Sequence, residues 1–289
     1  MRSFLFVPAT GGPKLDKAMA SGADAVILDL EDSIAPERKA DARAAALAYL
    51  KAAQGKKDRP RLLVRINGLD TGMIDADLDA VVAGAPYAVL FPKAEGGATV
   101  THLDAKLTAR EAIAGLPDGS IKILAQTVES AAGLFTAGSY RDSSARLIGM
   151  TWGPEDLSSE LGAEANREAD GTLTEPYRIA RAMCLYGAAA AKVPAIETIH
   201  VNYRDPEILR RDTELARRDG FTGRLAIHPA QVPVINEVFT PSAEQIEQAK
   251  AVVAAFAAQP GAGTVGIGGK MYDQPHLKRA QALLARTKT

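Results

Sequence analysis

The chain has 289 residues, of which 47% are hydrophobic and 24% are charged, and its 34 Lys and Arg nearly balance its 35 Asp and Glu. A chain of this length and composition can bury a sizeable core, either as one large α/β barrel or as two smaller domains. The balanced charge gives no bulk electrostatic attraction to nucleic acid or to a membrane surface, so small molecules are the expected partners.

The only cysteine, Cys184, lies in a helical-looking apolar stretch, which predicts a buried and unreactive thiol. A single cysteine also excludes disulfides and cysteine-based zinc sites within the chain. The apolar run near the first residues is too short for a secretory signal, and no apolar stretch is long enough to span a bilayer. A cytoplasmic location is therefore the default expectation.

Short β-branched and Leu-rich runs alternate with longer Ala-rich amphipathic stretches, which is the pattern of repeated βα units around a parallel sheet. Eight strands are predicted, near 3–7, 25–29, 61–66, 87–91, 121–126, 145–150, 196–201 and 224–227. Helices are expected near 37–52, 74–84, 98–115, 175–191 and 205–219. This rhythm favours a (β/α)8 TIM barrel over an open doubly wound sheet.

The barrel is expected to occupy residues 1–240, and residues 241–289 to form a C-terminal helical extension with a helix near 242–257. Residues 259–270 are the only glycine-dense stretch. Because glycine permits large backbone excursions, we expect this stretch to be a hinge that carries a lid segment.

Two phosphate-binding motifs fail in this glycine-dense stretch. Gly261, Gly263 and Gly266 match the spacing of a dinucleotide-binding loop, but no strand is predicted before them. The P-loop motif Gly-x-x-x-x-Gly-Lys-Ser/Thr also does not match, because Thr264 occupies the position of its first glycine and Met271 the position that requires Ser or Thr.

Polar residues follow most of the predicted strands. They are Asp29, Glu31, Asp32, Arg65, Asn67, Lys93, Glu129, Asp156, Asn202 and His228. Barrel enzymes place their chemistry at the carboxyl ends of the strands, because the loops there converge over one mouth. The sequence therefore predicts an active site at that face.

Glu129 and Asp156 come directly after two of these strands, and together they would make a site for a hard divalent cation such as Mg²⁺, with open positions for substrate and water. Each acid has a simpler interpretation as a helix-entry carboxylate, and Asp156 follows Pro154 as such residues do. Considered together with the other strand-end groups, the pair favours a metal site.

The other strand-end residues also have two interpretations. Arg65 either forms a structural salt bridge or binds a carboxylate or an enolate oxygen. Glu31 and Asp32 bind substrate or hold a metal-bound water, or they are ordinary loop acids. Lys93 fits an ion pair better than a Schiff-base nucleophile. His228 is a ligand, a base or a hydrogen-bonded loop histidine, and Asp29, Lys93 and His228 are all expected to support the site from behind.

The motifs Arg-Ser-Phe-Leu-Phe-Val-Pro, Leu-Asp-Leu-Glu-Asp-Ser, Val-Arg-Ile-Asn-Gly, Pro-Lys-Ala-Glu, Val-Glu-Ser-Ala-Ala-Gly, Gly-Pro-Glu-Asp-Leu, Ala-Ile-His-Pro and Gly-Lys-Met-Tyr-Asp occur in this order. The set resembles the citrate lyase β-subunit and malyl-CoA lyase group of the HpcH/HpaI aldolase superfamily. The likeness runs from about residue 2 to the last helix.

The resemblance implies a Mg²⁺-dependent Claisen-type cleavage or condensation of a 3-hydroxyacyl thioester of malyl-CoA, citramalyl-CoA or citryl type, with Mn²⁺ as an alternative metal. Glu129 and Asp156 would hold the metal, which chelates an α-keto acid, and Arg65 would stabilise the enolate of the thioester. Asp273 matches a family acid on a C-terminal lid, and it would act as acid/base over the site of a neighbouring subunit. That arrangement implies a homo-oligomer, a trimer or hexamer.

The chain departs from the family pattern near Gly11 and Gly12, where an arginine that could meet a phosphate of coenzyme A is absent and Lys14 is the candidate replacement. Pro154 replaces the usual Ala at a substrate-binding position, and Tyr272 replaces the usual aliphatic residue. The acyl carrier, coenzyme A or an acyl-carrier protein, is therefore open. The alternatives are an aldolase on free hydroxy-keto acids and a weakly active ligand-binding subunit of a lyase complex.

Overall fold

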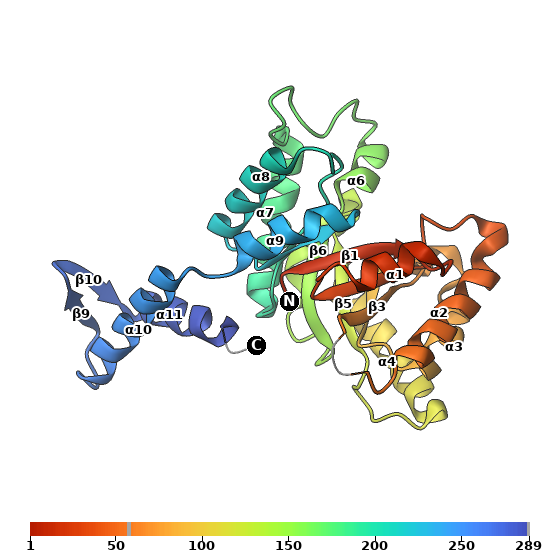
Figure 1. Ribbon diagram of the computed structural model, residues 1–289, viewed down its shortest axis with the longest axis horizontal. Helices are drawn as coiled ribbons and strands as arrows, with labels where there is room; N and C mark the ends of the chain where they lie inside the picture. Colours follow the sequence, from red (N-terminus) through yellow and green to blue (C-terminus); the bar gives the residue numbers. More distant parts are fainter. Residues whose placement is uncertain (57–58, 288–289) are drawn as a thin grey trace. The chain divides into compact units, whose positions relative to one another are not determined.

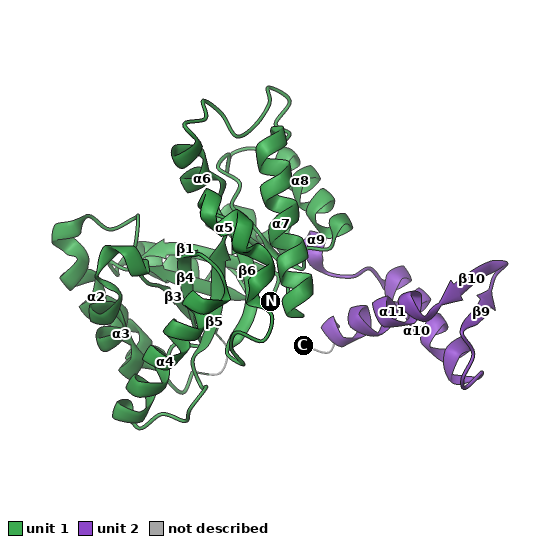
Figure 2. Cartoon of the chain, turned by 180° about the vertical axis from the view of Figure 1, so that it is seen from behind, with its two compact units in different colours: residues 1–236 green, residues 237–289 purple. Residues whose placement is uncertain are grey.

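The computed structural model describes residues 1–56 and 59–287. It divides into two compact units, Met1–Asn236 and Glu237–Thr289, coloured green and purple in Figure 2. The division falls close to the expected boundary at 240/241. Among the described helices, none combines the length and the apolar composition needed to cross a membrane.

The first unit is built on eight parallel strands, whose labels are those of Figure 1. The strands are β1 Ser3–Pro8, β2 Ala25–Asp29, β3 Arg61–Arg65, β4 Ala88–Ala94, β5 Lys122–Thr127, β6 Leu147–Trp152, β7 Ile196–Glu197 and β8 Gly223–Ala226. Their order around the sheet is β6-β5-β4-β3-β2-β1-β8-β7. A parallel bridge between Met150 and Ala195 links the two outer strands, so the sheet is a nearly closed barrel. The predicted TIM-barrel fold is confirmed.

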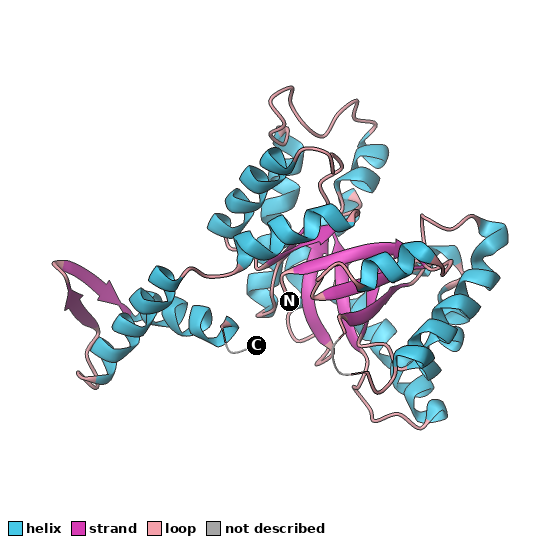
Figure 3. Ribbon diagram, in the orientation of Figure 1, coloured by secondary structure: helices cyan, strands magenta, loops and turns pink. Residues whose placement is uncertain are grey.

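Helices connect successive strands and surround the magenta strands of Figure 3. The α-helices of this unit are α1 Pro13–Met19, α2 Lys39–Ala53, α3 Ile74–Val81, α4 Gly97–Ala114, α5 Ala131–Thr136, α6 Pro154–Leu161, α7 Glu175–Ala191 and α8 Pro206–Asp219, and α9 Val232–Phe239 continues from this unit across the boundary at 236/237. Short 3₁₀ turns lie at Pro36–Arg38, Leu69–Thr71, Val82–Gly84, Ala137–Tyr140 and Pro229–Gln231. The five predicted helices are confirmed, whereas α1, α5, α6 and α9 were not among the predicted helices.

The predicted strand at 196–201 is wrong beyond Glu197, because β7 has only two residues. The Glu197 carboxylate accepts hydrogen bonds from its neighbour's backbone N–H, that of Thr198, at 2.9 Å and from Trp152 Nε1 at 2.7 Å. The Thr198 backbone donor is thus satisfied by a side chain and is not available to a neighbouring strand.

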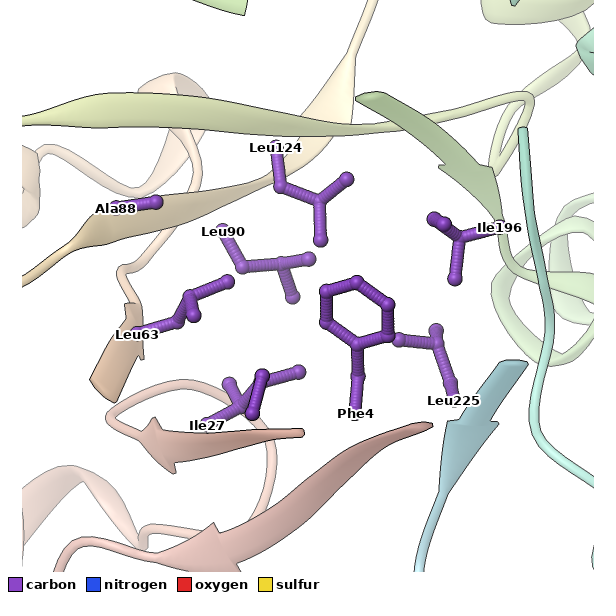
Figure 4. Close-up of a cluster of buried hydrophobic side chains, with 9 residues drawn as sticks. Phe4, Ile27, Leu63, Ala88, Leu90, Leu124, Ile196 and Leu225 are labelled. Atoms are coloured by element: carbon purple, nitrogen blue, oxygen red, sulfur yellow. The ribbon is translucent and has the colours of Figure 1, made fainter. Parts of the chain in front are cut away.

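The barrel interior has an apolar layer, drawn in Figure 4. Its buried members are Phe4, Ala25, Ile27, Leu63, Ala88, Leu90, Leu124, Ile196 and Leu225. Side chains on a strand alternate between the two faces, so a residue two positions further on points the same way. Asp29, Arg65 and Gln126 each lie two residues after a member of the apolar layer, namely Ile27, Leu63 and Leu124, and therefore face the barrel interior. The polar layer of the barrel therefore lies at the carboxyl ends of its strands.

The second unit contains α10 Ala243–Ala257, a hairpin of β9 Thr264–Ile267 and β10 Lys270–Asp273, and α11 Gln274–Arg286. Ala249, Val252, Phe256, Val265 and Ala280 form its small apolar core.

Part of the glycine-dense stretch 259–270 is a hairpin, because residues 264–267 form β9 and Lys270 begins β10. Gly268 and Gly269 form its turn with φ of 56° and 76°. A two-residue hairpin loop favours positive φ at both positions, which glycine adopts without strain. A hinge and a lid in this unit stay predictions.

Candidate active site at the carboxyl ends of the barrel strands

A pocket of about 410 Å³ opens at the carboxyl ends of the strands. It is lined by residues from seven strand ends and the loops after them: Phe6, Val7, Pro8, Asp29, Asp32, Ser33, Arg65, Gln126, Glu129, Gly153, Pro154, Glu155, Asp156, Thr198, Ile199, Leu225 and Ile227. The predicted site residues Asp29, Asp32, Arg65, Glu129, Pro154 and Asp156 are therefore brought to one cavity.

Arg65 ends β3 and contacts three acids. Its Nε and Nη2 donate to the two oxygens of Asp29, each at 2.7 Å, and its Nη1 lies 2.8 Å from Glu31 Oε2 and 3.2 Å from Asp32 Oδ2. The Phe6 ring lies 4.9 Å from the guanidinium carbon. Burial opposes ionisation of Asp29, but the hydrogen bonds and charge of Arg65 outweigh it and lower the pKa of Asp29 below its ordinary value. The guanidinium is thus held rigidly with one face toward the pocket.

Lys93 links acids from two sides of the site. Its ammonium lies 2.8 Å from Glu31 Oε1 and 3.8 Å from Asp156 Oδ1. Desolvation alone would lower the pKa of Lys93, but these carboxylates raise it above its ordinary value. A Schiff-base lysine needs a depressed pKa, so the geometry supports the ion-pair interpretation. Burial raises the pKa of Glu31, against the opposing charges of Arg65 and Lys93.

Glu129 is 2% exposed and is held by donors on both oxygens. The backbone N–H of Lys93 donates to Oε2 at 2.6 Å, and Gln126 Nε2 donates to Oε1. Burial raises the pKa of Glu129 well above its ordinary range, and the charges of Glu31 and Asp156 add to this effect.

The backbone around Glu129 is unusual. Lys93 and Val128 both have left-handed φ, at 48° and 55°. Such conformations are uncommon for residues other than glycine, and for a β-branched residue such as Val128 they are strained. The Val128 conformation turns the chain at the end of β5, so that the Glu129 side chain contacts Gln126 of that strand. The strain therefore positions the carboxylate.

The loop that carries Glu31 is supported from behind. The ammonium of Lys39 donates to the backbone carbonyls of Leu30 and Glu31 at 2.7 and 2.8 Å and to Asn67 Oδ1 at 2.8 Å. Asn67 in turn donates to Asp77 at 2.7 Å. Asn67 is thus a structural residue of this loop.

The residues present fit a magnesium ion. Mg²⁺ is usually bound by one or two carboxylates, together with water and substrate oxygens. Glu129 and Asp156 provide two carboxylates in one pocket, and the pKa of Glu129 is raised first by burial and then by the charges of Glu31 and Asp156, which a cation would offset. Within the described residues no group of three or more His, Cys, Asp or Glu is arranged to hold a metal.

Three predicted residues lie elsewhere. His228 is exposed, accepts a hydrogen bond from the Ala230 N–H at 3.2 Å and stacks on Tyr203, as a loop histidine does. Lys14 is exposed on α1. Asp273 belongs to the second unit, where it caps α11 and its carboxylate bonds to the His276 ring, which lowers its pKa.

The other residues that line the pocket were not predicted from the sequence, and three of them contact or adjoin the predicted groups. Gln126 looks like an ordinary strand residue, and only its position two residues after Leu124 marks it as facing the interior. Phe6 could have been found by the same alternation. Gly153 offers no signal in one sequence, yet a Cβ there would lie 2.4 Å from Glu129 Oε1.

Comparison with known proteins agrees with this geometry. The family model described as HpcH/HpaI aldolase/citrate lyase matches residues 2–229, and a second, described as a C-C bond lyase of the TIM-barrel fold, matches residues 171–289. Citrate lyase subunit beta of Leuconostoc mesenteroides subsp. cremoris is 33% identical, over 98% of this chain and 92% of its own. A (3S)-malyl-CoA thioesterase of Cereibacter sphaeroides is 34% identical, over 99% of this chain and 94% of its own.

A similar solved structure is that of the protein CitE from Mycobacterium tuberculosis in complex with magnesium, acetoacetate and coenzyme A. It has a TM-score of 0.76 and 33% sequence identity, and the match covers 100% of this chain and 98% of the other. With eight barrel strands, acids at their carboxyl ends and relatives matched along their whole length, the chain belongs to the HpcH/HpaI aldolase/citrate lyase family and is a carbon–carbon lyase.

Proposed function

We propose that the protein is a Mg²⁺-dependent lyase that cleaves or forms a 3-hydroxyacyl thioester of malyl-CoA, citramalyl-CoA or citryl type. The observation that carries the proposal is the single pocket that Glu129, Asp156 and Arg65 line together. Relatives crystallised with magnesium and coenzyme A, and with magnesium and oxaloacetate, support the choice of cofactor and substrate class.

Glu129 and Asp156 would hold the metal, which when bound supplies a Lewis acid for the oxo-acid half of the substrate. In cleavage, the 3-hydroxyl loses its proton, the bond between C2 and C3 breaks, and its electron pair passes into the enolate of the acyl thioester. Arg65, fixed by Asp29, offers a preorganised positive charge to that enolate. The enolate then takes a proton at C2.

Asp273 is the proposed acid/base for these proton transfers. The lid that would carry it is the segment 271–280 after the glycine-dense stretch, and a homotrimer or homohexamer would bring it to a neighbouring subunit's site. Size-exclusion chromatography with light scattering tests the oligomer, because a monomer would leave Asp273 without that route.

A panel of malyl-CoA, citramalyl-CoA and citryl thioesters, assayed with MgCl₂ and after EDTA, tests the function. We expect acetyl-CoA and glyoxylate from malyl-CoA, loss of turnover in EDTA and recovery on adding Mg²⁺ back, with MnCl₂ as the comparison metal. Equal turnover with and without EDTA would contradict the metal role. Turnover of free hydroxy-keto acids alone would select the aldolase alternative, and activity only with an added carrier subunit would select the complex.

A second candidate is hydrolysis of the thioester, favoured by the likeness to a malyl-CoA thioesterase. The same assay separates the two, because hydrolysis of malyl-CoA releases malate and free coenzyme A.

A further inference from the structure

We propose that Gln126 is a positioning residue for the cation, which acts by fixing the carboxylate of Glu129. The inference rests on the proposed function, because it concerns the metal that Glu129 is proposed to bind. Gln126 does not contact the cation itself in this proposal.

The position of Gln126 in the barrel is unusual for an amide. It lies on β5, 6% exposed, two residues after Leu124 of the apolar interior layer, and it pairs in register with Thr151 of β6. An apolar side chain could be buried here without a desolvation cost, whereas a buried amide needs hydrogen bonds at both its N–H and its carbonyl ends to offset its desolvation.

Only one end of the amide is satisfied. Nε2 donates to Glu129 Oε1, whereas Oε1 of Gln126 is buried and has no hydrogen-bond partner among the described residues. The amide cannot be turned round, because its carbonyl oxygen would then face a carboxylate oxygen. The hydrogen bond to Glu129 thus fixes the orientation of the Gln126 amide and leaves its carbonyl oxygen unpaired. We therefore take the bond to Glu129 to be the function of an amide at this position.

The Glu129 carboxylate is bounded on three sides. Gln126 holds Oε1 and the Lys93 N–H holds Oε2 at 2.6 Å, while the third side is the Gly153 backbone, where a Cβ would lie 3.0 Å from Glu129 Cγ and only glycine leaves space for the side chain. Each oxygen of a carboxylate has two lone pairs, so one on each stays open for a cation. The Lys93 donor belongs to the backbone, which leaves Gln126 as the only one of the two donors that substitution can remove.

Partners that orient a metal ligand change metal affinity by about 10- to 100-fold when they are removed. Gln126→Met keeps the approximate volume and removes the donor, so we expect its Mg²⁺ affinity to be weaker by about that factor. Thr151→Val is the matched control. Its hydroxyl is also buried in this layer without a partner among the described residues, so its removal should leave Mg²⁺ affinity as in the wild type.

The experiment is isothermal titration of MgCl₂ into the full chain, wild type and variants, with circular dichroism to check folding. If Gln126→Met fails to fold, Gln126→Asn replaces it, because Asn keeps a polar amide but is one methylene too short to reach Glu129. Weakened binding in the Gln126 variant with wild-type binding in Thr151→Val supports the proposal. Unchanged binding in the Gln126 variant, or an equal loss in Thr151→Val, overturns it. Absence of Mg²⁺ binding in the wild type overturns the proposed function, and this inference with it.

Discussion

Adding one methyl group at Gly153 should weaken Mg²⁺ binding. Gly153 precedes α6 with φ of −132° and ψ of 107°, a conformation that alanine adopts freely, so Gly153→Ala introduces no backbone strain. Its only effect is contact, because the new Cβ would lie 2.4 Å from Glu129 Oε1 and 3.0 Å from Glu129 Cγ.

The size of the effect follows from what must move. The carboxylate is at the end of a flexible side chain and can retreat, but it then loses its hydrogen bond from Gln126 or from the Lys93 N–H. A hydrogen bond to a charged group contributes about 1.5–3 kcal/mol. Since Mg²⁺ binding requires Glu129 in its original place, that energy appears as a loss of affinity of about 10- to 150-fold.

Isothermal titration with MgCl₂ measures this loss, and circular dichroism verifies that the fold is kept. Gly138→Ala is the matched control, because a Cβ at Gly138 meets nothing within 4 Å and its φ is not left-handed. If Gly153→Ala binds Mg²⁺ as tightly as the wild type while both variants are folded, then Glu129 is not the cation's ligand in this position.

Three further predictions concern other groups. Asp273→Asn should lower turnover by about 10²- to 10⁴-fold, as expected for the loss of a general acid/base. The variant should keep α11 intact, because Asn caps helices as well as Asp does. Unchanged turnover in the lyase assay would remove Asp273 from the mechanism. The Mg²⁺ affinity should rise with pH up to the raised pKa of Glu129, because below that pKa a proton competes with the cation for the carboxylate. Calorimetric titrations in buffers of different ionisation enthalpy should show that Mg²⁺ binding releases protons. A Mg²⁺ affinity that does not change with pH would contradict the burial of this carboxylate. Burial raises the pKa of the Cys184 thiol to about 12, so at pH 8 it should react with a thiol reagent only after unfolding, and rapid labelling of the native protein would refute its burial.

The fold and the location of the site could be predicted because both follow from patterns along the chain. Alternation of apolar and helical segments fixed the eight strands to within a few residues, except at β7. Asp29, Arg65 and Glu129 were identified because each ends or follows a strand, and parallel strands bring their carboxyl ends to one mouth.

The details that hold the site could not be predicted, because they depend on contacts between strands. The left-handed backbone of Lys93 and Val128 has no signal in residue type, since both residues normally avoid it. The contact between Gln126 and Glu129 needs that backbone. In the second unit, the glycine spacing does not by itself indicate that Thr264–Ile267 pairs with Lys270–Asp273 in a hairpin.

The charges of the pocket are distributed unequally, and this bears on where a cation would bind. On the side of β2 and β3, Arg65 neutralises Asp29 with two hydrogen bonds and lowers its pKa, so that side gains little from another cation. On the side of β5 and β6, Glu129 accepts only from an amide and a backbone N–H, neither of which carries charge, and its pKa is raised. The Lys93 ammonium pairs with Glu31 at 2.8 Å and lies 3.8 Å from Asp156. A divalent ion between Glu129 and Asp156 would supply the charge that this side lacks, and we infer that the uncompensated side of the pocket is the metal side.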